Sequence, residues 1–213
     1  MEKLILFQGD SITDALRSRD HEFFLCNGYP TLVSARLGFE EPGKYTFLNR
    51  GISGNRVVDL YARIKIDLIN LKPDVLSILI GVNDVWHEEE IKNGVDAAKF
   101  ERIYDMLLDE VQEALPGIRL VILEPFVLHG SATENTPEHP TRWEYFRDET
   151  PLRAAAARRV AEKHGATCVP LQHLVDEACK LAEPAYWLRD GVHPTAMGHE
   201  LIAREWVKAF RQE

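Results

Sequence analysis

Short runs of consecutive apolar residues alternate along the chain with longer segments in which apolar residues recur every three or four positions. The short runs predict buried β-strands, and the longer segments predict amphipathic helices. Five strands are expected, over residues 3–8, 46–49, 75–80, 120–123 and 167–169. Helices are expected over residues 56–71, 100–115, 152–164 and 195–210, and a helical turn is expected to begin at Ser11.

The predicted strands are apolar throughout, which is typical of a parallel sheet covered on both faces. Their alternation with helices predicts the α/β class, as a three-layer α/β/α sandwich around a central, mainly parallel five-stranded sheet, the flavodoxin-like arrangement. No repeat or linker divides the sequence, so we expect one domain over residues 1–213. Residues 38–45 and 127–150 form longer connections, and the second is open to interpretation as a lid, an interface or a solvated loop.

The amino-acid composition is consistent with this predicted fold. Hydrophobic residues make up 45% and charged residues 28%, which is ordinary for a soluble globular protein. The net charge of −9 argues against nucleic-acid and anionic-membrane partners. The apolar run at the N-terminus is too short for a signal peptide, and no run approaches a membrane span, so a cytoplasmic location is expected. Three scattered cysteines and the absence of metal-ligand spacing predict no metal.

Three short motifs follow the first three predicted strands, and a fourth precedes the last helix. They are Gly-Asp-Ser at 9–11, Gly-Ile-Ser-Gly-Asn at 51–55, Gly-Val-Asn-Asp at 81–84 and Asp-Gly-Val-His-Pro at 190–194. In an open parallel sheet, ligands bind beyond the carboxyl ends of the strands. The sequence therefore predicts that at least three of these motifs converge on one site.

The chemistry of these motifs suits a nucleophilic hydrolase. Ser11 supplies a hydroxyl that can attack, and His193 can act as its base while Asp190, three residues earlier, orients the imidazole ring. Each residue also has a structural interpretation, since Ser11 can cap a helix, Asp190 can cap a turn and His193 can be an ordinary surface histidine.

Donors for a developing oxyanion are available in the same motifs. The backbone N–H of Ser11, the N–H of Gly54 and the side-chain amide of Asn83 are the candidates. Turn formation alone would also explain Gly54 and Asn83. We interpret Asp10 and Asp84 as structural residues.

The four motifs in this order resemble the SGNH, or GDSL-like, hydrolase superfamily. The resemblance spans nearly the whole chain and implies a triad of Ser11, His193 and Asp190 with an oxyanion hole formed by Ser11, Gly54 and Asn83. It implies a serine ester hydrolase that needs neither metal nor cofactor. The chain has Gly-Asp-Ser-Ile where the family name has Leu, a conservative change.

Longer patterns around the motifs resemble the bacterial carbohydrate acetyl esterases, including acetylxylan esterases. These patterns cover residues 51–60, 81–86 and 187–194. The resemblance implies that short acyl groups, acetyl foremost, are removed from the hydroxyls of a small-molecule sugar ester. Trp86, His87 and Trp187 flank the motifs and are candidates for substrate binding, with core packing as the alternative.

Two other functions stay open. A lysophospholipase or thioesterase of the same superfamily would use the same residues on longer acyl chains. A catalytically inactive carbohydrate-binding protein would keep the fold without the reaction. Assembly into a homo-oligomer is a family expectation that the sequence does not test.

Overall fold

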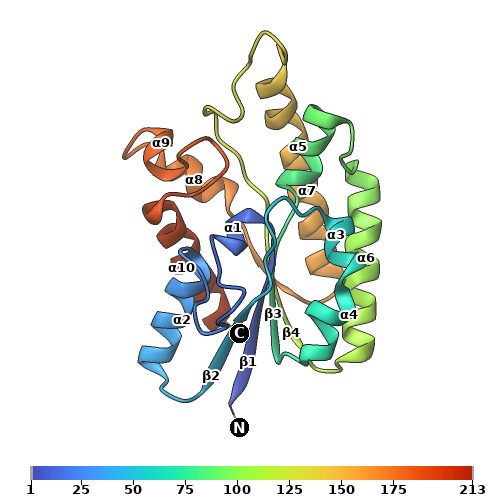
Figure 1. Ribbon diagram of the computed structural model, residues 1–213, viewed down its shortest axis with the longest axis vertical. Coiled ribbons are helices and arrows are strands. Elements are labelled where there is room, and N and C mark those ends of the chain that lie inside the picture. The colour runs from blue at the N-terminus through green and yellow to red at the C-terminus, as the bar shows by residue number, and fades with distance from the viewer. Residues whose placement is uncertain (1, 213) are drawn as a thin grey trace.

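The structure of the protein, a computed structural model that describes residues 2–212, is built around a five-stranded β-sheet (Figure 1). The strands lie in the order β2-β1-β3-β4-β5, and every neighbouring pair is parallel. Their bounds are Lys3–Gly9 (β1), Tyr45–Asn49 (β2), Val75–Leu79 (β3), Arg119–Leu123 (β4) and Thr167–Val169 (β5). All five strand predictions are confirmed, and the sheet is wholly parallel.

Successive residues of the central strands face opposite hydrophobic clusters. Ile5 and Phe7 of β1 pack into one cluster, and Leu6 between them packs into the other. All three side chains are fully buried. This double burial explains why the strands are continuously apolar, and it confirms the predicted α/β fold class.

Helices cover both faces of the sheet (Figure 1). One face carries α2 (Tyr29–Glu40), α8 (Gln172–Ala178), α9 (Pro184–Trp187) and α10 (Ala196–Arg211). The other carries α3 (Val57–Ala62), α4 (Ile64–Asp67), the 3-10 helix η1 (Ile69–Leu71), α6 (Ala97–Ala114) and α7 (Arg142–Lys163). Within residues 2–212, no helix combines the length and apolar character that a membrane span requires.

Two short helices begin directly where strands end. α1 (Ser11–Asp14) follows β1, and α5 (Val82–Ile91) follows β3. The chain passes from β1 to β2 on one side and returns to β3 on the other side of β1. The carboxyl ends of β1 and β3 therefore flank the point where the strand order reverses, which is where such sheets bind ligands.

The helix predictions are partly wrong. Residues 56–71 do not form one helix, because Arg63 interrupts the segment and its side chain donates to Asn55 Oδ1 and to the Arg50 carbonyl. These contacts to the preceding loops override the helical spacing. α2, α5 and α8 were not predicted at all.

The two predicted long connections are also shorter than expected. Helix α2 extends to Glu40, which leaves only residues 41–44 before β2. Helix α7 begins at Arg142 and not at residue 152, and Pro151 lies inside it. Only the first part of residues 127–150 is therefore irregular.

Candidate active site

Ser11 occupies the first position of α1, immediately after β1. The side chain of Asp10 caps this helix by accepting a hydrogen bond from Ile12 N–H at 3.0 Å. Among the described residues, the N–H of Ser11 has no hydrogen-bond partner. The hydroxyl and this backbone donor are thus presented together at the carboxyl edge of the sheet.

Ser11, His193 and Asp190 form a continuous chain of hydrogen bonds. Ser11 Oγ lies 3.0 Å from His193 Nε2, and His193 Nδ1 lies 2.7 Å from Asp190 Oδ2. The second carboxylate oxygen of Asp190 accepts from the backbone N–H groups of Val192 and His193, at 3.0 and 2.8 Å. Because Nδ1 faces a carboxylate it carries the proton, which leaves Nε2 as an acceptor toward Ser11.

The surroundings of Asp190 keep its carboxylate charged. Burial by itself would raise the pKa of Asp190, but the hydrogen bonds from the His193 ring, from His193 N–H and from Val192 N–H outweigh burial. Together they lower the pKa of Asp190 to about 2. The partner of the imidazole is therefore anionic throughout the neutral range.

Asn83 and the turn that contains Gly54 are tied together beside α1. Asn83 is 5% exposed and donates from Nδ2 to the Asn55 carbonyl at 3.1 Å. Asp84 accepts from Val57 N–H with both carboxylate oxygens, at 3.1 and 3.2 Å. Burial raises the pKa of Asp84 well above its ordinary value. These bonds fix α5 against the loop after β2, as expected if Asp84 is structural.

Gly54 adopts a backbone conformation that favours glycine. Its φ is +83°, in the left-handed region. The N–H of Gly54 has no hydrogen-bond partner among residues 2–212. The structure thus leaves two backbone donors, those of Ser11 and Gly54, and one side-chain amide near the end of the sheet where Ser11 lies.

A cavity of about 700 Å³ contains Ser11 and His193. Its other walls come from α1, the loop after it, the turn after β2 and the start of α10. These lining residues are Ile12, Asp14, Ala15, Leu16, Arg17, Arg19, Asn27, Ser53, Arg189, Pro194, Thr195, Ala196 and His199. Sequence reasoning assigned none of them a role, although Ser53 and Pro194 lie within the four motifs.

The three residues predicted to bind substrate lie outside the lining of this cavity. The Trp86 ring is 6.0 Å from the His193 ring and packs edge-on against Phe146 at 5.7 Å. Trp187 packs edge-on against Tyr186 at 5.0 Å. Burial, and next the charge of Arg56, lower the pKa of His87. Trp86 is the one of the three that contacts a residue of the hydrogen-bonded chain.

The irregular part of residues 127–150 supports the loop that carries Asp190. Leu128 N–H donates to the Gly191 carbonyl at 2.8 Å, and Ala132 N–H donates to the Asp190 carbonyl at 2.9 Å. Thr133, fully buried, donates from Oγ1 to the Leu128 carbonyl at 2.8 Å. We call residues 127–133 the brace.

The brace packs so closely against the loop that carries Asp190 that positions 130 and 191 require glycine. A Cβ atom on Gly191 would lie 2.5 Å from the Leu128 carbonyl oxygen, and the φ of Gly191 is +94°. A Cβ atom on Gly130 would lie 2.4 Å from Gly191 N. Nothing in the sequence signals this pairing, because its hydrogen bonds run through the backbone.

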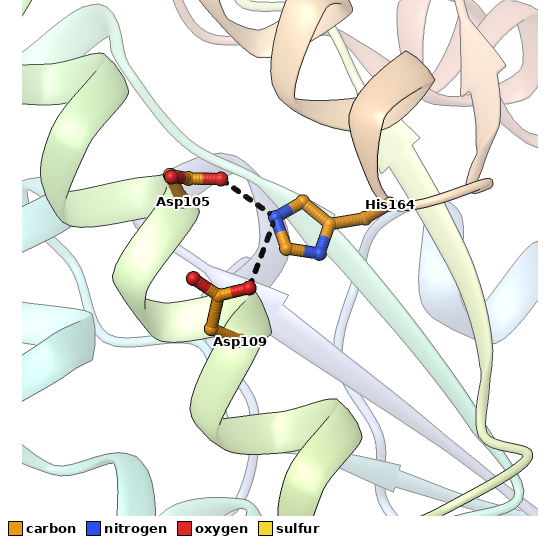
Figure 2. A group of neighbouring side chains, drawn as sticks. All are labelled: Asp105, Asp109 and His164. Carbon is orange, nitrogen blue, oxygen red and sulfur yellow. Dashed lines mark hydrogen bonds and ion pairs between the residues drawn. The ribbon is translucent and has the colours of Figure 1, made fainter.

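One group of potential metal ligands lies elsewhere, on α6 and at the end of α7 (Figure 2). Asp105, Asp109 and His164 offer ligand atoms within 4.8 Å of one another. Lys163 pairs with Asp105 at 2.6 Å, and Gln112 Oε1 lies 2.7 Å from His164 Nδ1. Asp105 and His164 thus already have partners within the protein. It is outside the cavity that contains Ser11.

The chain matches the model of the GDSL-like lipase/acylhydrolase family over residues 7–201. It is 34% identical to an acetylxylan esterase of Geobacillus stearothermophilus, over 98% of this chain and 97% of that protein.

Solved structures agree with this match. A Parabacteroides merdae protein named as a GDSL-like lipase has a TM-score of 0.88 and 36% identity, with coverage of 100% of this chain and 98% of the other. The acetylxylan esterase Axe2 of G. stearothermophilus has a TM-score of 0.81 and 31% identity, with coverage of 99% and 95%.

The buried charge of Asp10 gives a pH-dependent prediction. Burial raises the pKa of Asp10 to about 7, although the hydrogen bond from Ile12 opposes this. Between about pH 4 and pH 7 the folded protein therefore holds a proton that the unfolded chain has lost, so this residue's contribution to stability falls as the pH rises. We expect Asp10→Asn to raise the free energy of unfolding more at pH 8 than at pH 4, by roughly 4 kcal/mol.

Urea denaturation at the two pH values measures this difference. Asp20→Asn, the same substitution at an exposed aspartate, is the control. An equal gain at pH 4 and pH 8 for Asp10→Asn would contradict the prediction.

The brace gives a second prediction. Thr133→Val removes the hydroxyl that binds the Leu128 carbonyl and Gly130 N–H. We expect a loss of about 1–3 kcal/mol in unfolding free energy, because two buried backbone groups lose their partner. Amide hydrogen exchange at Val192 and His193 is expected to accelerate.

Thr133→Ser keeps the hydroxyl and is the matched control. Exchange at Val192 and His193 that stays at the wild-type rate in Thr133→Val would show that the brace does not hold this loop.

Proposed function

The chain belongs to the GDSL-like lipase/acylhydrolase family and is a carboxylic ester hydrolase, and from this premise we propose that it removes acetyl groups from carbohydrate hydroxyls. The proposed machinery is a triad of Ser11, His193 and Asp190 that works through an acyl-enzyme. The observation that carries the proposal is the hydrogen-bonded chain from Ser11 Oγ to His193 at 3.0 Å and on to Asp190 at 2.7 Å.

The reaction begins with attack of Ser11 Oγ on the ester carbonyl carbon. His193 Nε2 accepts the hydroxyl proton as the new C–O bond forms. Asp190 holds the Nδ1–H tautomer and stabilises the imidazolium, and its low pKa keeps it anionic for this task. The sugar then leaves as an alcohol, taking the proton from His193 Nε2 and breaking its bond to the acyl carbon.

The negative charge on the tetrahedral intermediate needs fixed donors. The N–H groups of Ser11 and Gly54 and the Asn83 amide are the proposed oxyanion hole. Asn83 has a second amide hydrogen beyond the one that it donates to Asn55. Water then attacks the acetyl-enzyme with His193 as base, which releases acetate and restores Ser11.

Similarity to an acetylxylan esterase over almost the whole length supports the acetyl and carbohydrate parts of the proposal. Polar side chains in the lining are consistent with a sugar, since Asn27 and Ser53 can exchange hydrogen bonds with hydroxyl groups.

Kinetics of two variants test the assigned roles. We expect Ser11→Ala to reduce turnover of an acetyl ester by roughly 10⁴-fold or more, because the nucleophile is lost. Asn83→Ala is expected to lower kcat by about 10²–10³-fold with a smaller change in KM, because this donor acts on the transition state.

Asn70→Ala, on the exposed residue of η1, is the control for Asn83→Ala and is expected to keep wild-type kcat. Circular dichroism and thermal unfolding confirm that each variant folds. Wild-type turnover in folded Ser11→Ala would overturn the proposed mechanism.

Acyl-chain length separates the proposal from a lysophospholipase or thioesterase. Asp14, Arg17 and Arg19 line the cavity, and an eight-carbon chain would displace water from them without replacing its hydrogen bonds. We therefore expect kcat/KM for an acetyl ester to exceed that for the matching octanoyl ester by about tenfold or more. A preference for octanoyl would assign the chain to the long-chain alternative.

A further inference from the structure

Three arginines line the cavity that contains Ser11, although the chain as a whole carries a net charge of −9. They are Arg17 and Arg19 from the loop after α1, and Arg189 from the loop before Asp190. The walls also contain the carboxylate of Asp14, and the carboxylate of Asp190 lies close to Arg189 without lining the cavity. The charge balance of the cavity therefore depends on how these groups are paired.

Both oxygens of the Asp14 carboxylate are already occupied by hydrogen bonds from within the protein. Its Oδ1 accepts from Arg17 N–H at 3.2 Å and from Arg19 Nη1 at 2.8 Å. Its Oδ2 accepts from Arg19 Nη2 at 2.5 Å and from Ser53 N–H at 3.1 Å. Asp14 is thus a partner for the guanidinium of Arg19 and for the backbone of Arg17, and not for the guanidinium of Arg17.

Arg17 is left with an oriented and partly buried guanidinium. Its Nε donates to the Gly51 carbonyl at 2.8 Å, which fixes the plane of the group. No carboxylate pairs with its terminal amino groups anywhere in residues 2–212. Burial, and next the charge of Arg19, lower the pKa of Arg17.

The other two arginines have acidic neighbours of their own. Arg19 is paired with Asp14, and Arg189 Nε lies 3.8 Å from Asp190 Oδ2. A partly buried charge normally has a partner within the protein. Arg17 has no carboxylate within ion-pair distance of its guanidinium in residues 2–212, although the charges of Asp14 and Asp67 act on it, and it lines the cavity that also contains Ser11.

We propose that Arg17 forms a subsite for an anionic group on the leaving sugar, and that the natural substrates are acetyl esters of carboxylate-bearing sugars. The inference rests on the proposed function and deepens it. A guanidinium whose Nε is already engaged presents its terminal amino groups as a planar fork, and a carboxylate matches that fork with two hydrogen bonds. Arg19 and Arg189 line the same cavity, each with a carboxylate neighbour.

A matched pair of substrates isolates the charge. One is a monoacetylated methyl glucuronoside, and the other is its uronamide, acetylated at the same hydroxyl. We expect wild-type kcat/KM to be roughly 10–100-fold higher for the acid, the range of one charge-assisted hydrogen-bonded contact, and to find most of the difference in KM. The preference is expected to shrink as salt is added.

Two variants assign the preference to Arg17. Arg17→Gln is expected to reduce the acid-to-amide ratio to about one, and Arg17→Lys to keep part of it because the charge remains. Arg159→Gln, on an exposed arginine of α7 that pairs with Glu101 outside the cavity, is the control and keeps the wild-type ratio.

The outcomes separate the two proposals. Cleavage of both esters at equal rates by wild type would overturn the anionic subsite and leave the acetyl esterase standing. Cleavage of neither, together with rapid hydrolysis of octanoyl esters, would overturn the proposed function itself. An equal loss on both esters in folded Arg17→Gln would mean that Arg17 only holds Gly51, and would overturn the subsite.

Discussion

The hydrogen bond between Ser11 Oγ and His193 Nε2 joins residues 182 positions apart, and the architecture around it serves to close that distance. A wholly parallel sheet places the carboxyl ends of all strands at one edge. Ser11 lies just after the end of β1, and Asn83 lies just after β3, which is the neighbour of β1 in the sheet. Two of the three elements of the proposed site are therefore brought together by strand pairing alone.

His193 needs a separate means of support, because it follows no strand. One carboxylate performs most of this task, since Asp190 binds the imidazole with Oδ2 and two backbone N–H groups of its own loop with Oδ1. The brace then binds the carbonyls of Asp190 and Gly191 from the other side. The residue that binds the imidazole is thus also the residue that shapes the loop, so the geometry and the charge of the proposed site are set together.

The strands could be predicted because each depends on local residue types, and continuous apolar runs indicated all five of them. The short motifs predicted that Ser11, His193 and Asp190 lie together, and the structure joins them by hydrogen bonds, while their catalytic roles stay a prediction. The helical spacing over residues 56–71 led to the wrong prediction of one continuous helix, because the contacts of Arg63 with earlier loops outweigh the local preference for helix. The brace could not be predicted, because its bonds use backbone groups that any residue possesses.

The balance of charges in the cavity could not be predicted from the sequence either, for a related reason. Net charge averages over a surface where water and salt screen each group, whereas inside a partly closed cavity the nearest few charges dominate. What decides their balance is the pairing of Asp14. The turn after α1 brings Arg17 N–H and Arg19 to this carboxylate, and the turn after β2 brings Ser53 N–H to it. An acidic chain can therefore place an arginine without a carboxylate partner in the cavity that contains Ser11, because loop geometry and not composition determines which charges are paired.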